Sequence, residues 1–216
     1  MATMKHSRRL ATVIGDVVGS RKAADRRAVH RRIVSVLEAV NAELLPVRPL
    51  TLANGDEFQG SFEHVGQALE AAFTVRLRLL PEVDTRYGLG WGDVEVLDHE
   101  RGIEDGPGWW VARDAIEWVA ATEKQAALRS VRTAFRSEAP DAPSPAAVGA
   151  ALLCRDQLVG SLDERSTRIL RGLMQQQSQA ELAAAEGISG SAVSQRARSD
   201  GLAAVVAAQA ELARVR

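Results

Sequence analysis

The sequence predicts a mixed α/β (α+β) domain at residues 1–138, followed by a small all-helical domain at 148–216. Up to residue 138, short runs rich in Val and Ile alternate with amphipathic stretches of helical spacing. A segment with three prolines then interrupts the pattern, and the sequence after it is rich in Ala and helical in period. We therefore expect two domains joined by a linker at 139–147.

Composition and charge limit the class of protein. The 216 residues are 46% hydrophobic and 25% charged, with a net charge of −1, which is an ordinary globular balance. One cysteine excludes an intrachain disulfide. No apolar run is long enough to cross a bilayer, and the first residues do not resemble a signal peptide. We expect a cytoplasmic protein with no membrane partner.

The first domain is expected to alternate strands and helices. Val29, Ile33 and Leu37 fall at helical spacing, and Pro46 ends that helix. Asn54 and Gly55 favour a hairpin turn because both tolerate positive φ. In chain order we expect a strand at 9–18, a helix at 23–45, hairpin strands at 49–53 and 57–62, and a helix at 64–80. A strand pair at 85–90 and 93–97, turning near Trp91 and Gly92, and a loop at 98–108 should follow. The last elements are a helix at 109–127, with Trp110 in the core, and a strand at 128–135.

Residues 12–21 form a candidate ligand-binding loop. An apolar strand ends at Asp16 and is followed by a loop containing Gly19 and Ser20, and then by a helix. Glycine lets the backbone approach a ligand, and N–H groups at a helix start point toward an anion. The surrounding residues 1–32 carry nine Lys or Arg against two acidic residues. The structural alternative is a buried strand that ends in Asp at a turn.

A second carboxylate, Asp56, follows Asn54 and Gly55 at the expected hairpin tip. If the hairpin lies beside the first strand, Asp16 and Asp56 face each other. Two Asp side chains with bound phosphates are a typical magnesium site, because Mg²⁺ prefers hard oxygen ligands. The alternative is that the segment is only a turn.

These motifs resemble the class III nucleotidyl cyclases and the related GGDEF domains over most of residues 9–120. The resemblance lies in the Asp16–Ser20 loop, in Gly55–Phe58, in Arg86–Val94 and in Gly108–Arg113. It implies a ferredoxin-like fold and a metal site for Mg²⁺ or Mn²⁺ at Asp16 and Asp56. It also implies a nucleoside triphosphate or other nucleotide as ligand, with contacts at Val17, Val18, Gly19, Ser20 and Gly55.

The resemblance is incomplete where active cyclases stabilise the transition state. Their late helix supplies an Asn and an Arg, but the Asn position here holds Trp110 or Val111. Arg113 is the candidate for the catalytic Arg, or it pairs with Asp114 or Glu117 on the surface. Because charge stabilisation is usually the largest catalytic contribution, a chain without these groups would bind a nucleotide without cyclising it.

The helical C-terminal region resembles a bacterial helix-turn-helix. Ser178 and Glu181 form a capping box, Gly187 makes the turn, and Val193 fills the core. Residues 161–216 carry seven Arg against six acids, so one copy would bind DNA weakly and a homodimer is expected. A protein-interaction module is the alternative. The residues expected to contact DNA are Ser189, Gly190, Ser191, Ser194, Gln195 and Arg198.

Nearly the whole chain resembles the SatD family, which combines this kind of N-terminal region with a C-terminal helix-turn-helix. We therefore expect a DNA-binding regulator whose cyclase-like domain senses a nucleotide with magnesium. One alternative is an active nucleotidyl cyclase or another nucleotide-processing enzyme. The other is a non-catalytic interaction scaffold.

Overall fold

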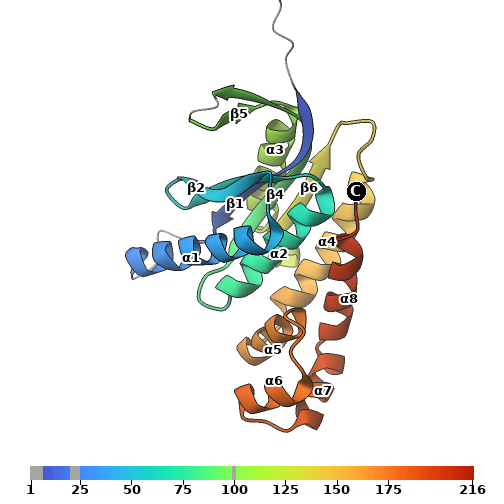
Figure 1. The fold of residues 1–216 in the computed structure, drawn as a ribbon. Coiled ribbons are helices and arrows are strands. Elements are labelled where there is room, and N and C mark those ends of the chain that lie inside the picture. The colour runs from blue at the N-terminus through green and yellow to red at the C-terminus, as the bar shows by residue number, and fades with distance from the viewer. Residues whose placement is uncertain (1–6, 20–24, 99–100) are drawn as a thin grey trace, which may run out of the picture.

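The computed structural model describes residues 7–19, 25–98 and 101–216, so Ser20 lies outside the described part. A twisted sheet occupies the N-terminal part, and a group of helices follows it (Figure 1). The elements of the N-terminal part are β1 (Arg8–Val17), α1 (Arg26–Leu44), β2 (Arg48–Asn54), β3 (Glu57–Phe62), α2 (Val65–Leu79), β4 (Thr85–Asp98), β5 (Ile103–Asp105), α3 (Pro107–Thr122), a 3₁₀ turn (Ala126–Leu128) and β6 (Thr133–Ser137).

The strand order is β2-β3-β1-β4, and each of these neighbours pairs antiparallel. This is the order of a ferredoxin-like β-α-β-β-α-β unit, in which each helix connects two strands separated by a third. β6 extends the sheet by pairing parallel with β4. The expected mixed α/β fold is therefore confirmed.

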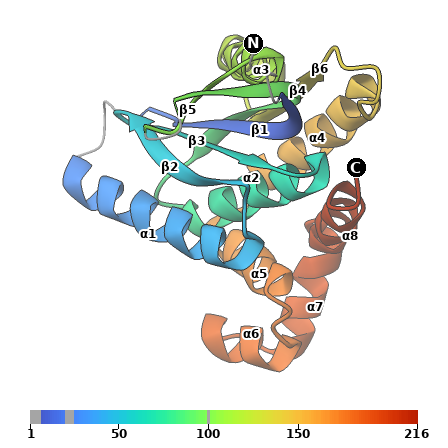
Figure 2. The same cartoon turned by 45° about the horizontal axis from the view of Figure 1, so that its top comes forward.

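Helices cover both faces of the sheet (Figure 2). Along β1, Val13 and Val17 belong to the core shared with α1 and α2, whereas Leu10 and Ile14 belong to the core under α3. The buried Thr12 hydroxyl donates to the carbonyl of Gly108 in α3 at 2.8 Å. Because side chains alternate along a strand, Asp16 is directed to the α3 side.

The expected turn near Trp91 and Gly92 is wrong, because residues 85–98 form one continuous strand. Gly92 of the expected turn, like Gly88 and Gly90 before it, instead lets α3 approach β4. A Cβ on Gly88 would lie 2.1 Å from the carbonyl oxygen of Ala112, and one on Gly90 would lie 2.2 Å from that of Gly108. The partner of the far end of β4 is β5, which lies within the expected loop 98–108.

The boundaries of α3 and β6 also differ from the expectation. α3 covers Pro107–Thr122 rather than 109–127, and β6 covers Thr133–Ser137 rather than 128–135. Trp110 is 59% exposed, and Trp109 is the buried tryptophan at 8%. The reason is the helical register, since Trp109 shares a face with the buried Ala112 and Ile116.

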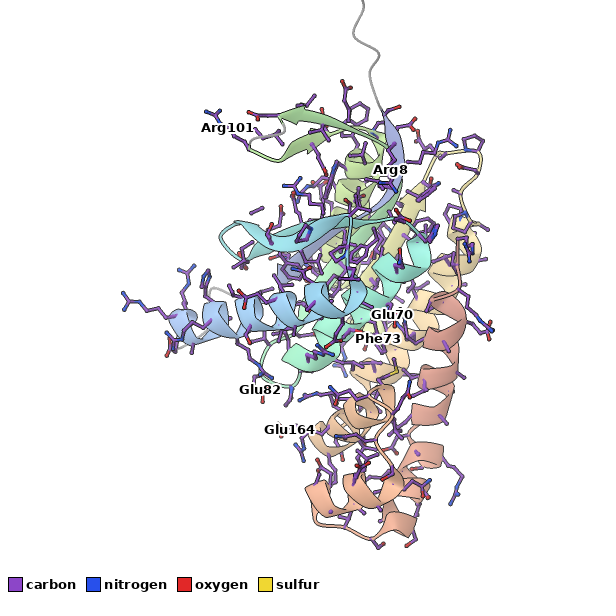
Figure 3. The ribbon with its side chains drawn as sticks, in the orientation of Figure 1. Arg8, Glu70, Phe73, Glu82, Arg101 and Glu164 are labelled. Atoms are coloured by element: carbon purple, nitrogen blue, oxygen red, sulfur yellow. The ribbon has the colours of Figure 1, made fainter. Side chains whose placement is uncertain are left out.

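The C-terminal helices pack against α2. Phe73 and Leu77 of α2 lie in one hydrophobic cluster with Ile169 and Leu170, and Figure 3 shows Phe73 at this boundary. Because the core is shared, a separate C-terminal domain beginning at 148 stays a prediction. These helices are α4 (Pro145–Gly160), α5 (Glu164–Met174), α6 (Gln179–Glu186), α7 (Gly190–Ser199) and α8 (Leu202–Leu212).

No helix within the described residues is long and apolar enough to cross a membrane.

The close approach of α3 to β4 predicts that Gly88→Ala is destabilising, by about 1–3 kcal/mol, because the added methyl meets helix backbone that cannot move aside cheaply. Gly149→Ala is the matched control, since it lies in α4 with open space around the added methyl and should be neutral or stabilising. Urea unfolding followed by circular dichroism measures both. Equal stability of the two variants would contradict the packing role of Gly88.

Candidate functional site

The structure brings Asp16 and Asp56 together. Gly15 pairs with Phe58, which places the β2–β3 loop beside the end of β1. The loop residues are Gly55 and Asp56, and Gly55 has a φ of +66°. The two Asp side chains are close enough for their charges to interact. The pKa of Asp16 is raised above its usual range, chiefly because burial disfavours the charged form, and the charge of Asp56 adds to the effect.

Arg86 on β4 lies directly opposite Asp16 and binds it. Its Nε and Nη2 atoms donate to Asp16 Oδ2 at 3.0 and 2.5 Å, and its Nη1 atom donates to Glu123 Oε1 at 2.6 Å. Arg86 favours the charged form of Asp16, although burial outweighs it. The guanidinium therefore holds Asp16 in place and partly neutralises it.

Arg113, the catalytic candidate, binds Glu57 through two hydrogen bonds of 2.6 and 2.8 Å. The alternative of a surface pair with Asp114 or Glu117 is therefore wrong, because the α3 register directs Arg113 toward Glu57 on the sheet. The hydrogen bonds from Arg113 lower the pKa of Glu57 below its usual range. The catalytic role of Arg113 stays a prediction.

Asp56 differs from the carboxylates around it. Asp16 has Arg86 and Glu57 has Arg113, but no described residue provides Asp56 with a cationic partner. Its contact is another carboxylate, Asp16. Two close carboxylates stabilise each other only through a proton or a cation. A cation bound beside Asp56 would therefore stabilise the site.

The donor set fits a divalent cation only in part. No group of three or more His, Cys, Asp or Glu side chains within the described ranges is arranged to hold a metal ion. Asp16 and Asp56 would supply two carboxylate ligands. Mg²⁺ commonly takes one or two protein carboxylates and completes its shell with substrate phosphates and water. The pair therefore suits a metal that arrives with a phosphate ligand.

The loop after β1 is described only as far as Gly19. The side chain of Val17 is buried in the core. The N–H of Val18 donates to the carbonyl of Asp84 at 2.9 Å, so it is already engaged. Gly19 has a φ of +69° and is exposed, as is Gly55 in the hairpin loop. Nucleotide contacts at these positions stay a prediction, with Gly19 and Gly55 as the accessible backbone.

The proposed helix-turn-helix residues lie on α6 and α7, which are joined by three residues containing Gly187 at a φ of +64°. Ser189 caps α7, and the buried Val193 belongs to the cluster beneath it. The residues expected to contact DNA divide by exposure. Ser189, Ser191, Gln195 and Arg198 are exposed, whereas Gly190 and Ser194 are half-buried.

Two charged residues of this region carry out a packing role. Glu186 accepts two hydrogen bonds of 2.8 Å from Arg168, and Arg196 donates to Asp163 at 2.9 Å and to Ser166 at 2.7 Å. Ion pairs thus join α6 and α7 to α5 at positions where a helix-turn-helix usually has apolar residues. Binding of DNA by α7 stays a prediction.

The sequence profile of the SatD family matches residues 10–213. The chain belongs to the SatD family. No curated protein matches it.

Several solved structures share part of the fold of this SatD-family chain. A bacterial light-regulated adenylyl cyclase is 16% identical, with a TM-score of 0.47 over 62% of this chain and 44% of that one. The adenylyl cyclase CyaB from P. aeruginosa is 11% identical, with a TM-score of 0.41 over 51% and 72% of the two chains. The guanylyl cyclase Cya2 is 12% identical, with a TM-score of 0.37 over 53% and 72%. The SatD-family chain therefore spans less than half of the light-regulated cyclase.

Sequence reasoning missed Arg86 and Glu123 as members of the site. Arg86 becomes a neighbour of Asp16 only through the β1–β4 register, and Glu123 only through the end of α3. A charged residue in the first half of β4, which is otherwise free of charge up to Gly92, was the one available signal for Arg86. Its partner could not be deduced from spacing.

The contacts of Asp16 predict how its pKa responds to substitution in this SatD-family protein. Asp56→Asn should lower the Asp16 pKa, because the neighbouring charge that raises it is removed. Arg86→Gln should raise the Asp16 pKa further, because it removes the main stabiliser of the charged form. Carboxyl ¹³C NMR titration measures both. Movement of the pKa in the same direction in both variants would contradict the arrangement.

Proposed function

We propose that this SatD-family protein binds a nucleotide together with a divalent cation at Asp16 and Asp56. The observation that carries the proposal is the position of Asp56, which touches Asp16 and has no cationic partner among the described residues. A divalent cation between the two carboxylates replaces their repulsion with attraction. Hard oxygen ligands favour Mg²⁺ or Mn²⁺.

Because the pKa of Asp16 is raised, the affinity of the site for a cation should depend on pH. A cation binds the ionised carboxylate, and the proton competes with it. The affinity for the cation therefore rises as the pH increases through the Asp16 pKa, which lies above the ordinary value for Asp. Arg86 also competes, because it already supplies positive charge to Asp16.

Binding without turnover is the function that the side chains support best. Stabilisation of a phosphoryl-transfer transition state requires cationic groups directed at the developing charge. Arg113 is instead engaged by both oxygens of Glu57. An active nucleotidyl cyclase is the second candidate. It is favoured because Arg113 is near enough to Asp16 for their charges to interact, so an arginine is present beside the carboxylate pair. A non-catalytic scaffold would neither bind nor convert a nucleotide.

Nucleoside triphosphates should raise the melting temperature of the wild-type protein in the presence of Mg²⁺, because a ligand that binds the folded state stabilises it. The Asp16→Asn/Asp56→Asn variant should lose the Mg²⁺-dependent part of the shift. Glu38→Gln/Glu138→Gln removes two exposed carboxylates elsewhere and should keep the full shift. A thermal-shift scan measures all three proteins.

The same reaction mixtures separate the candidate functions. A cyclic or cleaved product that disappears in the Asp16→Asn/Asp56→Asn variant would establish an enzyme. Binding without product supports a sensor. The absence of any shift with every nucleotide would overturn both and leave the scaffold.

We further propose that α7 binds DNA and that a homodimer places two copies on one duplex, with the nucleotide setting their spacing. The exposure of Gln195 and Arg198 on one helix supports this proposal. Gln pairs with adenine, and Arg pairs with guanine or phosphate. The near-neutral charge of residues 161–216 means that a single copy would bind weakly.

Gln195→Ala/Arg198→Ala should therefore weaken DNA binding and leave the melting temperature unchanged, because both side chains are exposed. Arg101→Ala/Arg214→Ala removes two other exposed arginines and serves as the control. Fluorescence anisotropy with a genomic fragment pool at low salt measures the affinity. An equal effect of the two double variants would indicate general charge attraction and contradict recognition by α7.

A further inference from the structure

The first two turns of α1 carry three arginines that form no ion pair with any described residue. Most arginines of this chain are ion-paired, and the described residues include fourteen such arginines. No ion pair joins Arg26, Arg27 or Arg31 to any residue in the described ranges, and His30 lies among them. All four side chains are exposed. Clustered like charges on one helix are unfavourable on their own, so an anion at this place would stabilise them.

These side chains line a cavity of about 470 Å³ between α1 and the β2–β3 hairpin. The opposite wall contains Gly55 and Asp56, and the floor contains Leu52 together with Val29 and Ile33 of α1. Figures 1 and 2 both show the first turns of α1 at the same end of the molecule as the hairpin loop. The cavity thus joins a basic wall, an apolar floor and one member of the carboxylate pair.

We propose that this cavity binds the polyphosphate chain of an organic phosphate, with Arg26, Arg27 and Arg31 as the anion-binding side chains. The inference deepens the proposed function, because it names the ligand class and the groups that hold it. Guanidinium groups match phosphate oxygens in geometry and bind them through charge-assisted hydrogen bonds. Three arginines suit an anion of several charges better than a single phosphate.

The apolar floor indicates which chemical group the ligand carries beside its phosphates. Val29, Ile33 and Leu52 offer apolar surface beneath the basic wall, which suits a sugar and a base rather than a bare anion. A cavity of this volume lies in the usual range for small-ligand sites, which is about 300–1,000 Å³. A nucleoside polyphosphate offers phosphate groups to the basic wall and a sugar and base to the apolar floor. It also leaves phosphate oxygens beside Asp56, where a cation is needed.

The binding of inorganic triphosphate in EDTA, measured by isothermal titration calorimetry, tests the basic wall without the metal. We expect measurable binding that weakens as salt is added, because the arginines are exposed. Arg26→Gln/Arg27→Gln/Arg31→Gln should weaken it at least about tenfold, since each lost charge-assisted hydrogen bond contributes roughly that much. Arg101→Gln/Arg136→Gln/Arg214→Gln removes three exposed arginines elsewhere and should bind as the wild type does.

Nucleoside triphosphates in EDTA should bind more tightly than inorganic triphosphate, and Leu52→Asn should remove that difference. The proposal is overturned if the triple arginine variant binds inorganic triphosphate like the wild type. It is also overturned if that variant loses affinity for duplex DNA while keeping its affinity for triphosphate, since α1 would then be a nucleic-acid surface.

The two proposals fail in different ways. Loss of the Mg²⁺-dependent shift in Asp16→Asn/Asp56→Asn with no effect of the arginine substitutions would support the metal site and reject the basic wall. Metal-free triphosphate binding that depends on the arginines, without any Mg²⁺ effect, would support the wall and reject the metal site.

Discussion

The buried ion-pair cluster of Arg76, Arg155 and Asp156 is the interaction on which the arrangement of the molecule depends. The Asp156 carboxylate is fully buried, and both arginines are 2% exposed. Asp156 accepts from Arg76 at 3.3 Å and from the backbone N–H of Arg132 at 2.8 Å. Buried charges are tolerated only when they are paired, and loss of one partner leaves the other uncompensated. α2, α4 and the start of β6 must therefore meet at this point.

The same cluster extends in two directions. Arg155 donates to Gln209 of α8 at 2.8 Å, and its guanidinium lies 4.5 Å from the ring of Phe73, so it holds the last helix against α2. In the other direction, alternating acids and arginines reach the candidate site. The pairs are Arg76–Asp84 at 3.0 Å, Arg132–Asp84 at 2.6 Å, Arg132–Glu123 at 3.3 Å, Arg86–Glu123 at 2.6 Å and Arg86–Asp16 at 2.5 Å. The position of Asp16 is thus tied to the packing of the C-terminal helices.

Sequence patterns predicted most of the elements in their order, and they predicted that Asp16 and Asp56 would meet if the hairpin lay beside the first strand. The pairing of β1 with β3 fulfils that condition. They failed where tertiary contacts decide. Gly92 was interpreted as a turn residue, whereas it lies within β4 and makes room for α3. The partner of Arg113 was sought on its own helix, but it is Glu57, on a strand that only the fold brings under α3. Spacing along the chain contains no information about such cross-element pairs.

The distribution of charge explains why the hairpin loop is the place where a ligand would be recognised. On its α3 side, Asp16 and Glu57 are each held by an arginine, and Asp56 is the carboxylate left without one among the described residues. On its α1 side, Arg26, Arg27 and Arg31 line the cavity and form no ion pair with any residue that the structure describes. A simple anion would satisfy the arginines and repel Asp56, and a simple cation would do the reverse. A polyphosphate that carries its own divalent cation satisfies both sides at once, so the two proposed subsites describe one ligand.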